Sequence, residues 1–141
     1  MKKTNMLPHK AEIIEIKQET ETNLNIKTFR YRFKDPEIRE NFTFKPGQFM
    51  MVTVFGVGEA PFGFASSPTE EDYIEFSVKE VGKVTEALHN LKEGDVIGIR
   101  GPFGNGFPVE STDGKNIIFI GGGIGLAPLR SMINYVLDDE N

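Results

Sequence analysis

A glycine-rich turn near the C-terminal end of the chain has the composition of an anion-binding site. The turn and the residues after it are Gly121, Gly122, Gly123, Gly125, Leu126, Ala127 and Pro128. Residues 117–120 before it are apolar, so residues 116–120 predict a buried strand, and Pro128 stands where the first turn of a helix is expected. Glycine lets a backbone approach a ligand closely, and the first N–H groups of a helix favour an anion. We therefore predict that these residues contact a nucleotide pyrophosphate.

A second candidate stretch lies at residues 61–66. Phe62 and Phe64 flank Gly63, so a flat heteroaromatic ligand can lie on an aromatic ring while the Gly63 backbone bonds its edge. The alternative is an ordinary strand whose aromatic side chains pack in the core. The residues expected to contact a ligand are Pro61, Phe62, Gly63, Phe64, Ala65 and Ser66.

A third candidate stretch joins Gly82 to a short helix that we expect to be capped by Thr85. The N–H groups of Lys83, Val84 and Thr85 would form a second anion site, strengthened by the helix dipole. The alternative is a plain capped helix that closes the end of a barrel. A fourth stretch, residues 101–108, holds three glycines and two prolines and either walls a ligand site or connects two domains.

The elements that position these stretches are mostly short strands. Residues 24–33 alternate cleanly between apolar and polar, which is typical of a strand with one buried face. The strands are predicted at 11–17, 24–33, 49–55, 61–65, 73–79 and 96–100, with one helix at 85–91. This order predicts a mainly β fold, a six-stranded antiparallel Greek-key barrel with one capping helix.

A different pattern follows the turn at Asp113 and Gly114. One strand, the glycine turn and one helix (130–137) form a single strand–loop–helix unit of an incomplete nucleotide-binding domain. We expect a barrel domain at 1–112 and this unit at 113–141. The helix carries an exposed apolar stripe formed by Met132, Ile133, Val136 and Leu137.

Composition excludes several classes of site. The 141 residues include no cysteine, which excludes disulfides and thiolate-held metal or iron–sulfur centres within the chain. His9 and His89 are too few for a histidine metal cluster, and we expect His89 at the surface. A net charge of −5 argues against nucleic acid, including the possibility of an oligonucleotide-binding barrel. The chain has neither a membrane-spanning stretch nor a secretory signal, so we expect a cytoplasmic protein.

Five motifs in order give the chain a resemblance to the ferredoxin–NADP reductase family. They are Lys-Pro-Gly-Gln-Phe (45–49), Ala-Pro-Phe-Gly-Phe-Ala-Ser (60–66), Val-Gly-Lys-Val-Thr (81–85), Gly-Pro-Phe-Gly-Asn-Gly-Phe (101–107) and Gly-Gly-Gly-Ile-Gly-Leu-Ala-Pro (121–128). Within the family the chain is most similar to electron-transfer subunits of nickel–iron hydrogenase, anaerobic sulfite reductase and dihydroorotate dehydrogenase.

The resemblance implies an FAD-binding barrel. The family's arginine, tyrosine and hydroxyl residue, which contact the pyrophosphate and the flavin ring, correspond here to Ala60, Phe62 and Gly63. Loss of the arginine contact costs about 1.5–3 kcal/mol, roughly tenfold to a hundredfold in affinity. Gly82 and Thr85 match the family's second phosphate site. Val78 and Lys79, just before it, complete the expected cofactor contacts.

The implied function is electron transfer between NAD(P)H and an iron–sulfur or metal-centred partner subunit. The flavin carries the chemistry, so no catalytic side chain and no metal ligand is assigned. The chain ends at Asn141, before the rest of the nicotinamide domain and the family's cluster-binding cysteines, so we expect an incomplete NAD(P)H site and no activity of this chain alone. The alternative is a flavin-free barrel that acts as an interaction or assembly module, with the apolar helix stripe promoting homo-oligomers.

Overall fold

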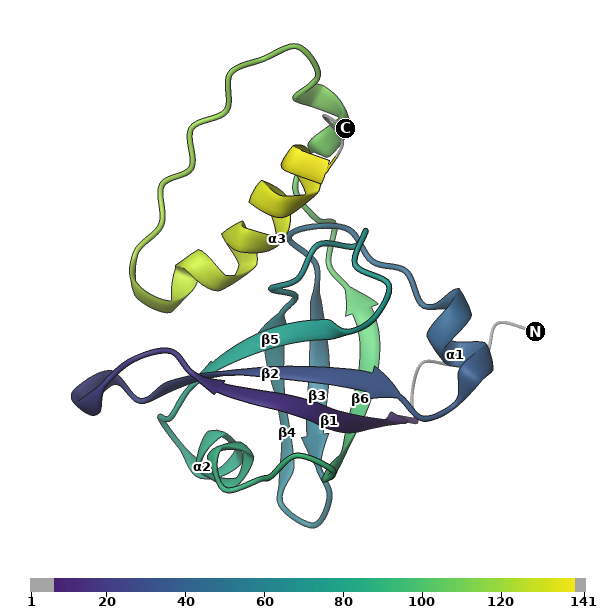
Figure 1. The fold of residues 1–141 in the computed structure, drawn as a ribbon, viewed down its shortest axis with the longest axis vertical. Coiled ribbons are helices and arrows are strands. Elements are labelled where there is room, and N and C mark those ends of the chain that lie inside the picture. The colour runs from purple at the N-terminus through teal and green to yellow at the C-terminus, as the bar shows by residue number, and fades with distance from the viewer. Residues whose placement is uncertain (1–6, 139–141) are drawn as a thin grey trace.

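The computed structural model describes residues 7–138 and confirms the mainly β fold. The strands are β1 (His9–Gln18), β2 (Ile26–Phe33), β3 (Phe49–Val54), β4 (Gly58–Gly63), β5 (Ile74–Lys79) and β6 (Val96–Phe103). They form one antiparallel sheet in the order β4-β3-β6-β1-β2-β5 (Figure 1). The sheet curls into a half-barrel whose two edge strands, β4 and β5, form no ladder with each other.

The core lies inside the curl of the sheet. Phe29, Tyr31 and Phe33 alternate along β2 and are buried, as the sequence pattern predicts. Phe29 stacks on Phe76 of β5 with 5.3 Å between ring centroids. The Tyr31 hydroxyl donates to the Met50 sulfur at 3.0 Å, and its burial raises the pKa of Tyr31 well above 10.0.

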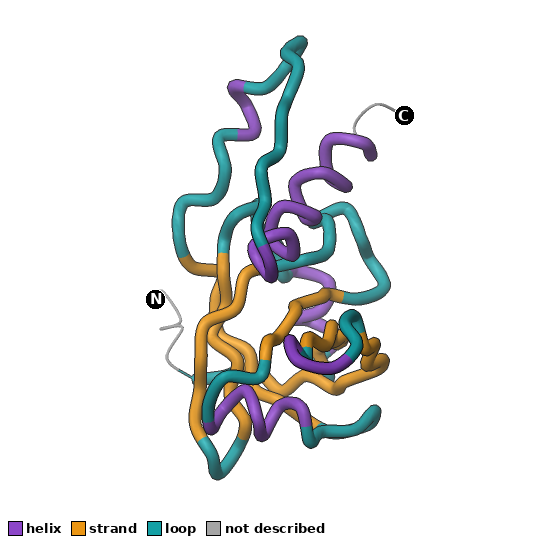
Figure 2. The backbone as a smooth tube through the Cα atoms, turned by 90° about the vertical axis from the view of Figure 1, so that its left-hand side faces the viewer, coloured by secondary structure: helices purple, strands orange, loops and turns teal. Residues whose placement is uncertain are grey.

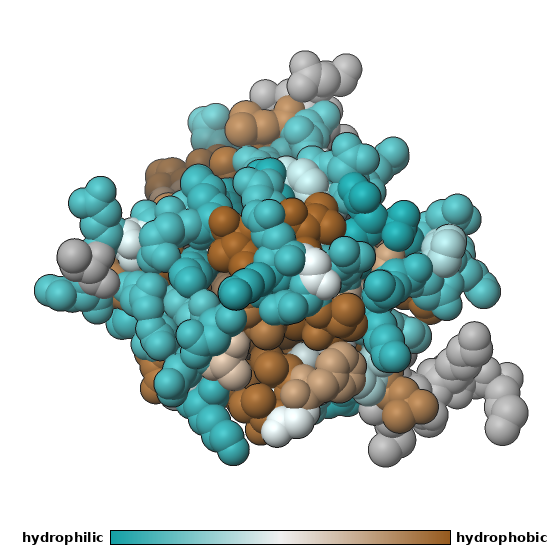
Figure 3. Space-filling model, turned by 60° about the horizontal axis from the view of Figure 1, so that its bottom comes forward, coloured by the Kyte–Doolittle hydropathy of each residue, from teal (hydrophilic) through white to brown (hydrophobic). Residues whose placement is uncertain are grey.

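Helix α2 (Lys83–His89) covers one end of the half-barrel, as predicted. Its buried side chains, Thr85, Leu88 and His89, recur at helical spacing and form one face. The expectation that His89 lies at the surface is wrong, because this face turns inward: its Nε2 lies 2.9 Å from the Val78 carbonyl oxygen. Figure 3 shows apolar side chains gathered on this end of the molecule among polar ones.

Helix α1 (Pro36–Asn41) was not predicted, although its start signal is present in the sequence. Asp35 is the N-cap, its carboxylate accepts from the Glu37 N–H at 2.9 Å, and Pro36 occupies the first turn. The Asp-Pro pair therefore both ends β2 and begins a helix. Three short 3₁₀ turns complete the elements: η1 (Thr22–Leu24), η2 (Val109–Ser111) and η3 (Gly123–Gly125).

The strand predicted at 116–120 is absent, and the expectation is wrong. Ile118 and Ile120 are 85% and 89% exposed, and the segment loops away from the sheet (Figures 1 and 2). A strand needs a neighbour to bond its backbone, and no strand of the described chain lies beside this segment.

Helix α3 (Leu126–Asp138) follows the glycine turn, and Pro128 lies in its first turn, as predicted. Its apolar stripe is not exposed as a whole, which corrects the expectation. Met132 is buried, Ile133 and Val136 are half-buried, and Leu137 remains exposed. No helix of residues 7–138 is long and apolar enough to cross a membrane.

Candidate functional site

The site is built around the opening between β4 and β5, called the seam from here on. One backbone hydrogen bond closes its end: the Ala65 N–H donates to the Glu75 carbonyl at 2.8 Å. The Ser66 hydroxyl accepts from the Glu75 N–H at 3.0 Å beside it. The seam therefore opens along β4 and β5 on one side of this closure.

Backbone groups face the seam from both strands. Alternate residues of a strand direct their N–H and C=O groups to the same side. Because Ala65 and Glu75 face each other across the seam, Gly63 on β4 and Ser77 and Lys79 on β5 direct their backbone groups there as well. Buried or partly buried backbone groups require partners, and the hydrogen-bonding edge of a flat ligand can supply them.

The two aromatic residues of β4 and its extension have different roles. Phe62 is half-buried, with its ring 5.4 Å from that of Phe76 on the other side of the seam. Phe64 is fully buried and stacks on Phe44 at 4.0 Å, nearly parallel. The Phe64 side chain therefore belongs to the core, as the alternative interpretation of this stretch held, and Phe62 packs against the edge of the same core.

The start of α2 lies at the first residue of β4. A Cβ added at Gly58 would be 3.2 Å from a Val84 methyl group. Thr85 caps the helix as expected, but from the third helical position and not as the N-cap residue. Gly82 takes that place, and the Thr85 hydroxyl accepts from the Val81 and Gly82 N–H groups at 2.8 Å each. In a helix that starts at Lys83, the N–H groups of Lys83, Val84 and Thr85 precede the first intrahelical bond, and their binding of an anion stays a prediction.

The start of α3 lies at the other end of β4. A Cβ added at Gly63 would be 3.2 Å from the Pro128 Cβ. The glycine turn itself is tight: the Gly125 N–H donates to the Gly122 carbonyl at 3.1 Å, and Gly123 has φ +56°. A small cavity of about 210 Å³ separates the turn from the sheet, and Thr28, Ser77, Ala127 and Arg130 are among its lining residues.

Thus the structure places the predicted residues in two groups, one at the start of α2 and one at the start of α3, at the two ends of β4. Pro61, Phe62 and Gly63 line the strand between the starts of α2 and α3. Of the remaining predicted contacts, Val78, Ala65 and Ser66 are buried, and Lys79 is half-buried. Gly121 contacts α3 rather than the sheet, since a Cβ there would be 3.0 Å from the Leu129 side chain.

Five residues that sequence analysis did not identify also lie here. Glu75 of β5 binds two guanidinium groups, Arg30 Nε at 2.7 Å and Arg130 Nη2 at 2.9 Å. The Glu75 bond raises the pKa of Arg30. Ser77 faces Thr28 across β2 and β5, with 2.8 Å between their hydroxyl oxygens. Opposite charges at Arg30 and Glu75 were visible in the sequence, but the register that pairs them was not.

The motifs at 45–49 and 101–107 pack against each other. The Gln48 side chain donates to the Gly104 carbonyl at 2.8 Å, and the Phe107 N–H donates to the Pro46 carbonyl at 2.7 Å. Gly47 has φ +87°, and a Cβ there would be 2.7 Å from the Phe107 nitrogen. These contacts favour a structural role for the loop at 101–108 over a role as the wall of a ligand site.

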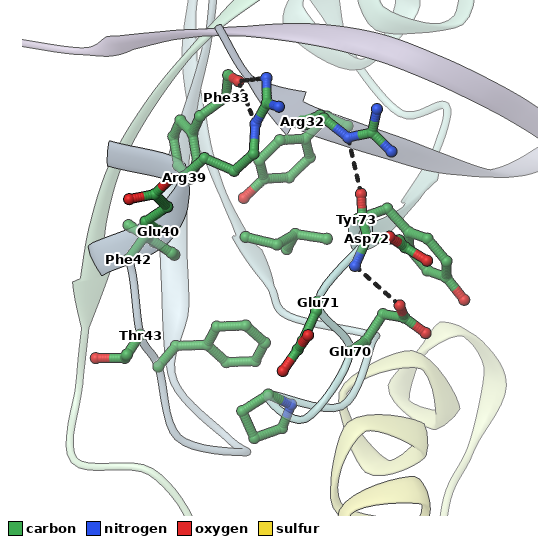
Figure 4. A pocket seen from close by; sticks show the side chains of 14 residues that line it. Arg32, Phe33, Arg39, Glu40, Phe42, Thr43, Glu70, Glu71, Asp72 and Tyr73 are labelled. Atoms are coloured by element: carbon green, nitrogen blue, oxygen red, sulfur yellow. Dashed lines mark hydrogen bonds between the residues drawn. The ribbon is translucent and has the colours of Figure 1, made fainter. Parts of the chain in front are cut away.

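A larger cavity of about 480 Å³ lies between α1, the end of β2 and the loop before β5 (Figure 4). None of the predicted contact residues lines it. Its two arginines bind backbone carbonyls: Arg32 reaches Asp72 at 2.9 Å, and Arg39 reaches Phe33 at 2.7 Å. The described residues hold no group of three His, Cys, Asp or Glu side chains suited to a metal ion.

Comparison with known proteins agrees with this geometry. Residues 14–107 match the oxidoreductase FAD-binding domain family. Sulfhydrogenase 2 subunit gamma of Pyrococcus furiosus is 50% identical over 128 residues, covering 91% of this chain and 43% of that protein. A probable dihydroorotate dehydrogenase B electron transfer subunit of Methanocaldococcus jannaschii is 42% identical over 125 residues, covering 88% and 42%. The chain thus spans less than half the length of these relatives.

Solved structures show the same fold. Ferredoxin-NADP⁺ reductase from Plasmodium falciparum superposes with a TM-score of 0.80 at 18% identity, covering 98% of this chain and 57% of that one. The NADH-dependent reduced ferredoxin-NADP oxidoreductase gives 0.73 at 29% identity, covering 90% and 44%. The resemblance inferred from the five motifs is confirmed, and the chain belongs to the oxidoreductase FAD-binding domain family of ferredoxin reductase-like electron-transfer proteins.

Proposed function

We propose that the chain holds FAD along the seam and passes electrons between NAD(P)H and a partner electron-transfer subunit. The observation that carries the proposal is the placement of the seam. Backbone groups of Gly63 and Ser77 face it, the start of α2 lies at one end of β4, and the start of α3 lies at the other. A ligand with a flat ring and a pyrophosphate matches these three features.

The residues along the seam fit the two parts of FAD differently. Phe62 offers a ring face, and Gly63 offers an N–H and a carbonyl without a side chain. Bound FAD would supply the redox chemistry, since it accepts electrons as a pair and releases them singly. The protein's part is to hold the ring edge and to exclude water from it, which needs no acidic or basic side chain at the seam.

The pyrophosphate is assigned to the first turn of α2. The N–H groups of Lys83, Val84 and Thr85 are available there, and Lys83 is exposed and adds a positive charge. Ala60 supplies no charge. The nearby Arg100 of β6 binds Glu59 of β4 across the intervening strand β3, with Nη2 2.5 Å from Oε1, so its charge is paired with a carboxylate. Backbone N–H groups therefore carry most of the phosphate binding.

The nicotinamide nucleotide is assigned to the glycine turn, with the domain boundary near residue 112. Support comes from the contact of Pro128 with Gly63, which sets this turn beside the proposed flavin strand. The names of the relatives, subunits of a sulfhydrogenase and of a dihydroorotate dehydrogenase, support a partner subunit. An iron–sulfur centre in that partner, a homo-oligomer and a cytoplasmic location are further parts of the proposal.

Titration of the protein with flavins tests the proposed site. FAD should bind with saturable quenching of its fluorescence, and riboflavin, which lacks the phosphates, should bind at least tenfold more weakly because it cannot use the start of α2. Equal affinity for the two would contradict the phosphate assignment. Absence of binding by a folded protein would favour the assembly-module alternative.

A further inference from the structure

Glu75 is a nearly buried carboxylate that binds two guanidinium groups from different parts of the chain. Its side chain is 10% exposed. Arg30, the cross-strand neighbour on β2, binds Oε1 of Glu75 through its Nε at 2.7 Å. Arg130 of α3 binds Oε2 through its Nη2 at 2.9 Å. Arg30 is held further by Glu15 at 2.6 Å and lies 4.2 Å over the Tyr73 ring. The carboxylate therefore joins a fixed position on the barrel to α3.

Arg130 contacts the closed end of the seam as well. Its Nε donates to the Ala65 carbonyl at 3.4 Å, and Ala65 is the residue whose N–H closes the seam on Glu75. Pro128, two residues before Arg130, lies against Gly63. One side chain thus binds both sides of the closure, immediately after the segment that touches the seam.

Burial of the Glu75 carboxylate strengthens its pairing with the two arginines. A charge that is largely removed from water is destabilising unless it is paired and hydrogen-bonded, so Glu75 holds its partners firmly. The two partners are not equivalent. Without Arg130, Glu75 still pairs with Arg30, and the barrel keeps its contacts. Without the Glu75 charge, both guanidinium groups lose their shared partner.

We propose that Glu75 is a positioning residue that holds the glycine turn beside the seam through Arg130. It would contact neither flavin nor nicotinamide and would act only by fixing α3. Its consequence for electron transfer rests on the proposed function, whereas the placement of α3 does not. The placement of α3 and its consequence for electron transfer can therefore be tested separately.

Hydrogen exchange of the whole chain, with and without added FAD, tests the placement. Arg130→Met should speed exchange in the first turns of α3 about tenfold or more, with β2, β5 and the melting temperature nearly unchanged. Glu75→Gln should speed the same amides and also lower the melting temperature, while Glu75→Asp should restore part of the protection. Matched controls are Arg32→Met on β2 and Glu12→Gln on β1, whose carboxylate lies 3.8 Å from Lys34.

The visible circular dichroism of bound FAD tests the positioning role itself. Arg130→Met should change this band, because the start of α3 lies against Gly63, while Arg32→Met should not. Unchanged exchange in α3 in both variants would overturn the proposal, and so would faster exchange with an unaltered flavin band. If the unmodified chain binds no FAD, the proposed function fails, and exchange of α3 alone decides whether Glu75 holds the turn.

Discussion

Gly63 on β4 lies against Pro128 on α3, and a side chain at position 63 would press on the proline ring. A Cβ added at Gly63 would lie 3.2 Å from the Pro128 Cβ. This contact brings together two stretches that are 65 positions apart in the sequence. It sets the glycine turn next to the strand proposed to hold the flavin ring.

Replacing Gly63 with a branched residue should therefore displace α3. We expect Gly63→Val to lower the free energy of unfolding by about 1–3 kcal/mol, the usual range for overpacking, and to weaken FAD binding. Thermal or urea unfolding measures the first effect. Gly122→Val is the matched control for stability, since no atom lies within 4 Å of a Cβ added there. Equal losses in the two variants would contradict the contact.

Restoring a charge at position 60 should strengthen cofactor binding. Ala60 is half-buried on β4, between the start of α2 and Gly63. Ala60→Arg should tighten FAD binding by roughly tenfold to a hundredfold, the effect of a hydrogen bond to a charged group. Ala60→Met is the control for added length without charge. FAD titrations that give the same affinity for both variants would show that no phosphate lies near this position.

Loss of the Thr85 hydroxyl should loosen the start of α2. The hydroxyl accepts from two N–H groups and donates to the Gly82 carbonyl at 2.8 Å. Thr85→Val should cost about 1–2 kcal/mol of stability and weaken FAD more than riboflavin. Thr53→Val, which removes the bond from the Thr53 hydroxyl on β3 to Glu59, is the comparison outside α2. Parallel losses for FAD and riboflavin would contradict the assignment of α2 to the phosphates.

Tyr31 should make the fold sensitive to alkali. Burial raises the pKa of Tyr31 well above its ordinary value of 10.0, so the folded state keeps the proton that the unfolded state loses. The stability that the neutral hydroxyl gives is therefore complete below about pH 10 and decreases as the pH rises above it. Unfolding measured from pH 8 to 11 should show this decrease in the parent protein and a smaller one in Tyr31→Phe. Identical pH profiles would exclude Tyr31 as its source.

Glu59 should make the stability of the fold depend on pH in the acid range. The bond from Arg100 lowers the pKa of Glu59, so its stabilising effect is present above the ordinary value of 4.5 and is lost as the pH falls below it. Glu59→Gln should flatten the acid limb of the stability profile between about pH 5 and 3. Glu12→Gln, whose carboxylate lies 3.8 Å from Lys34, is the matched carboxylate-to-amide control.

Much of the sheet could be predicted from sequence because each strand carries its own pattern. The alternation along β2 is a property of its eight consecutive residues and needs no partner to be recognised. Residues 116–120 have an equally apolar composition, but whether they form a strand depends on a neighbour that the described chain does not provide. His89 was misplaced for a related reason: its burial follows from how α2 meets β5.

The candidate site likewise contains residues that local sequence marks and residues whose role depends on the tertiary structure. The glycines, Phe62 and the start of α2 were recognised because local composition marks them. Glu75, Ser77 and Arg130 were not, since their role arises from the β2–β5 register and from the placement of α3. Sequence motifs therefore located the ends of the site, and tertiary structure supplied the residues that hold those ends together.

The most direct test of the central claim is the visible absorption spectrum of the purified protein after incubation with FAD and desalting. The seam as described should retain flavin, and the spectrum should show its visible band in proportion to the protein. A protein that is folded by circular dichroism yet colourless after excess FAD would contradict flavin binding at the seam and leave the assembly module as the better account.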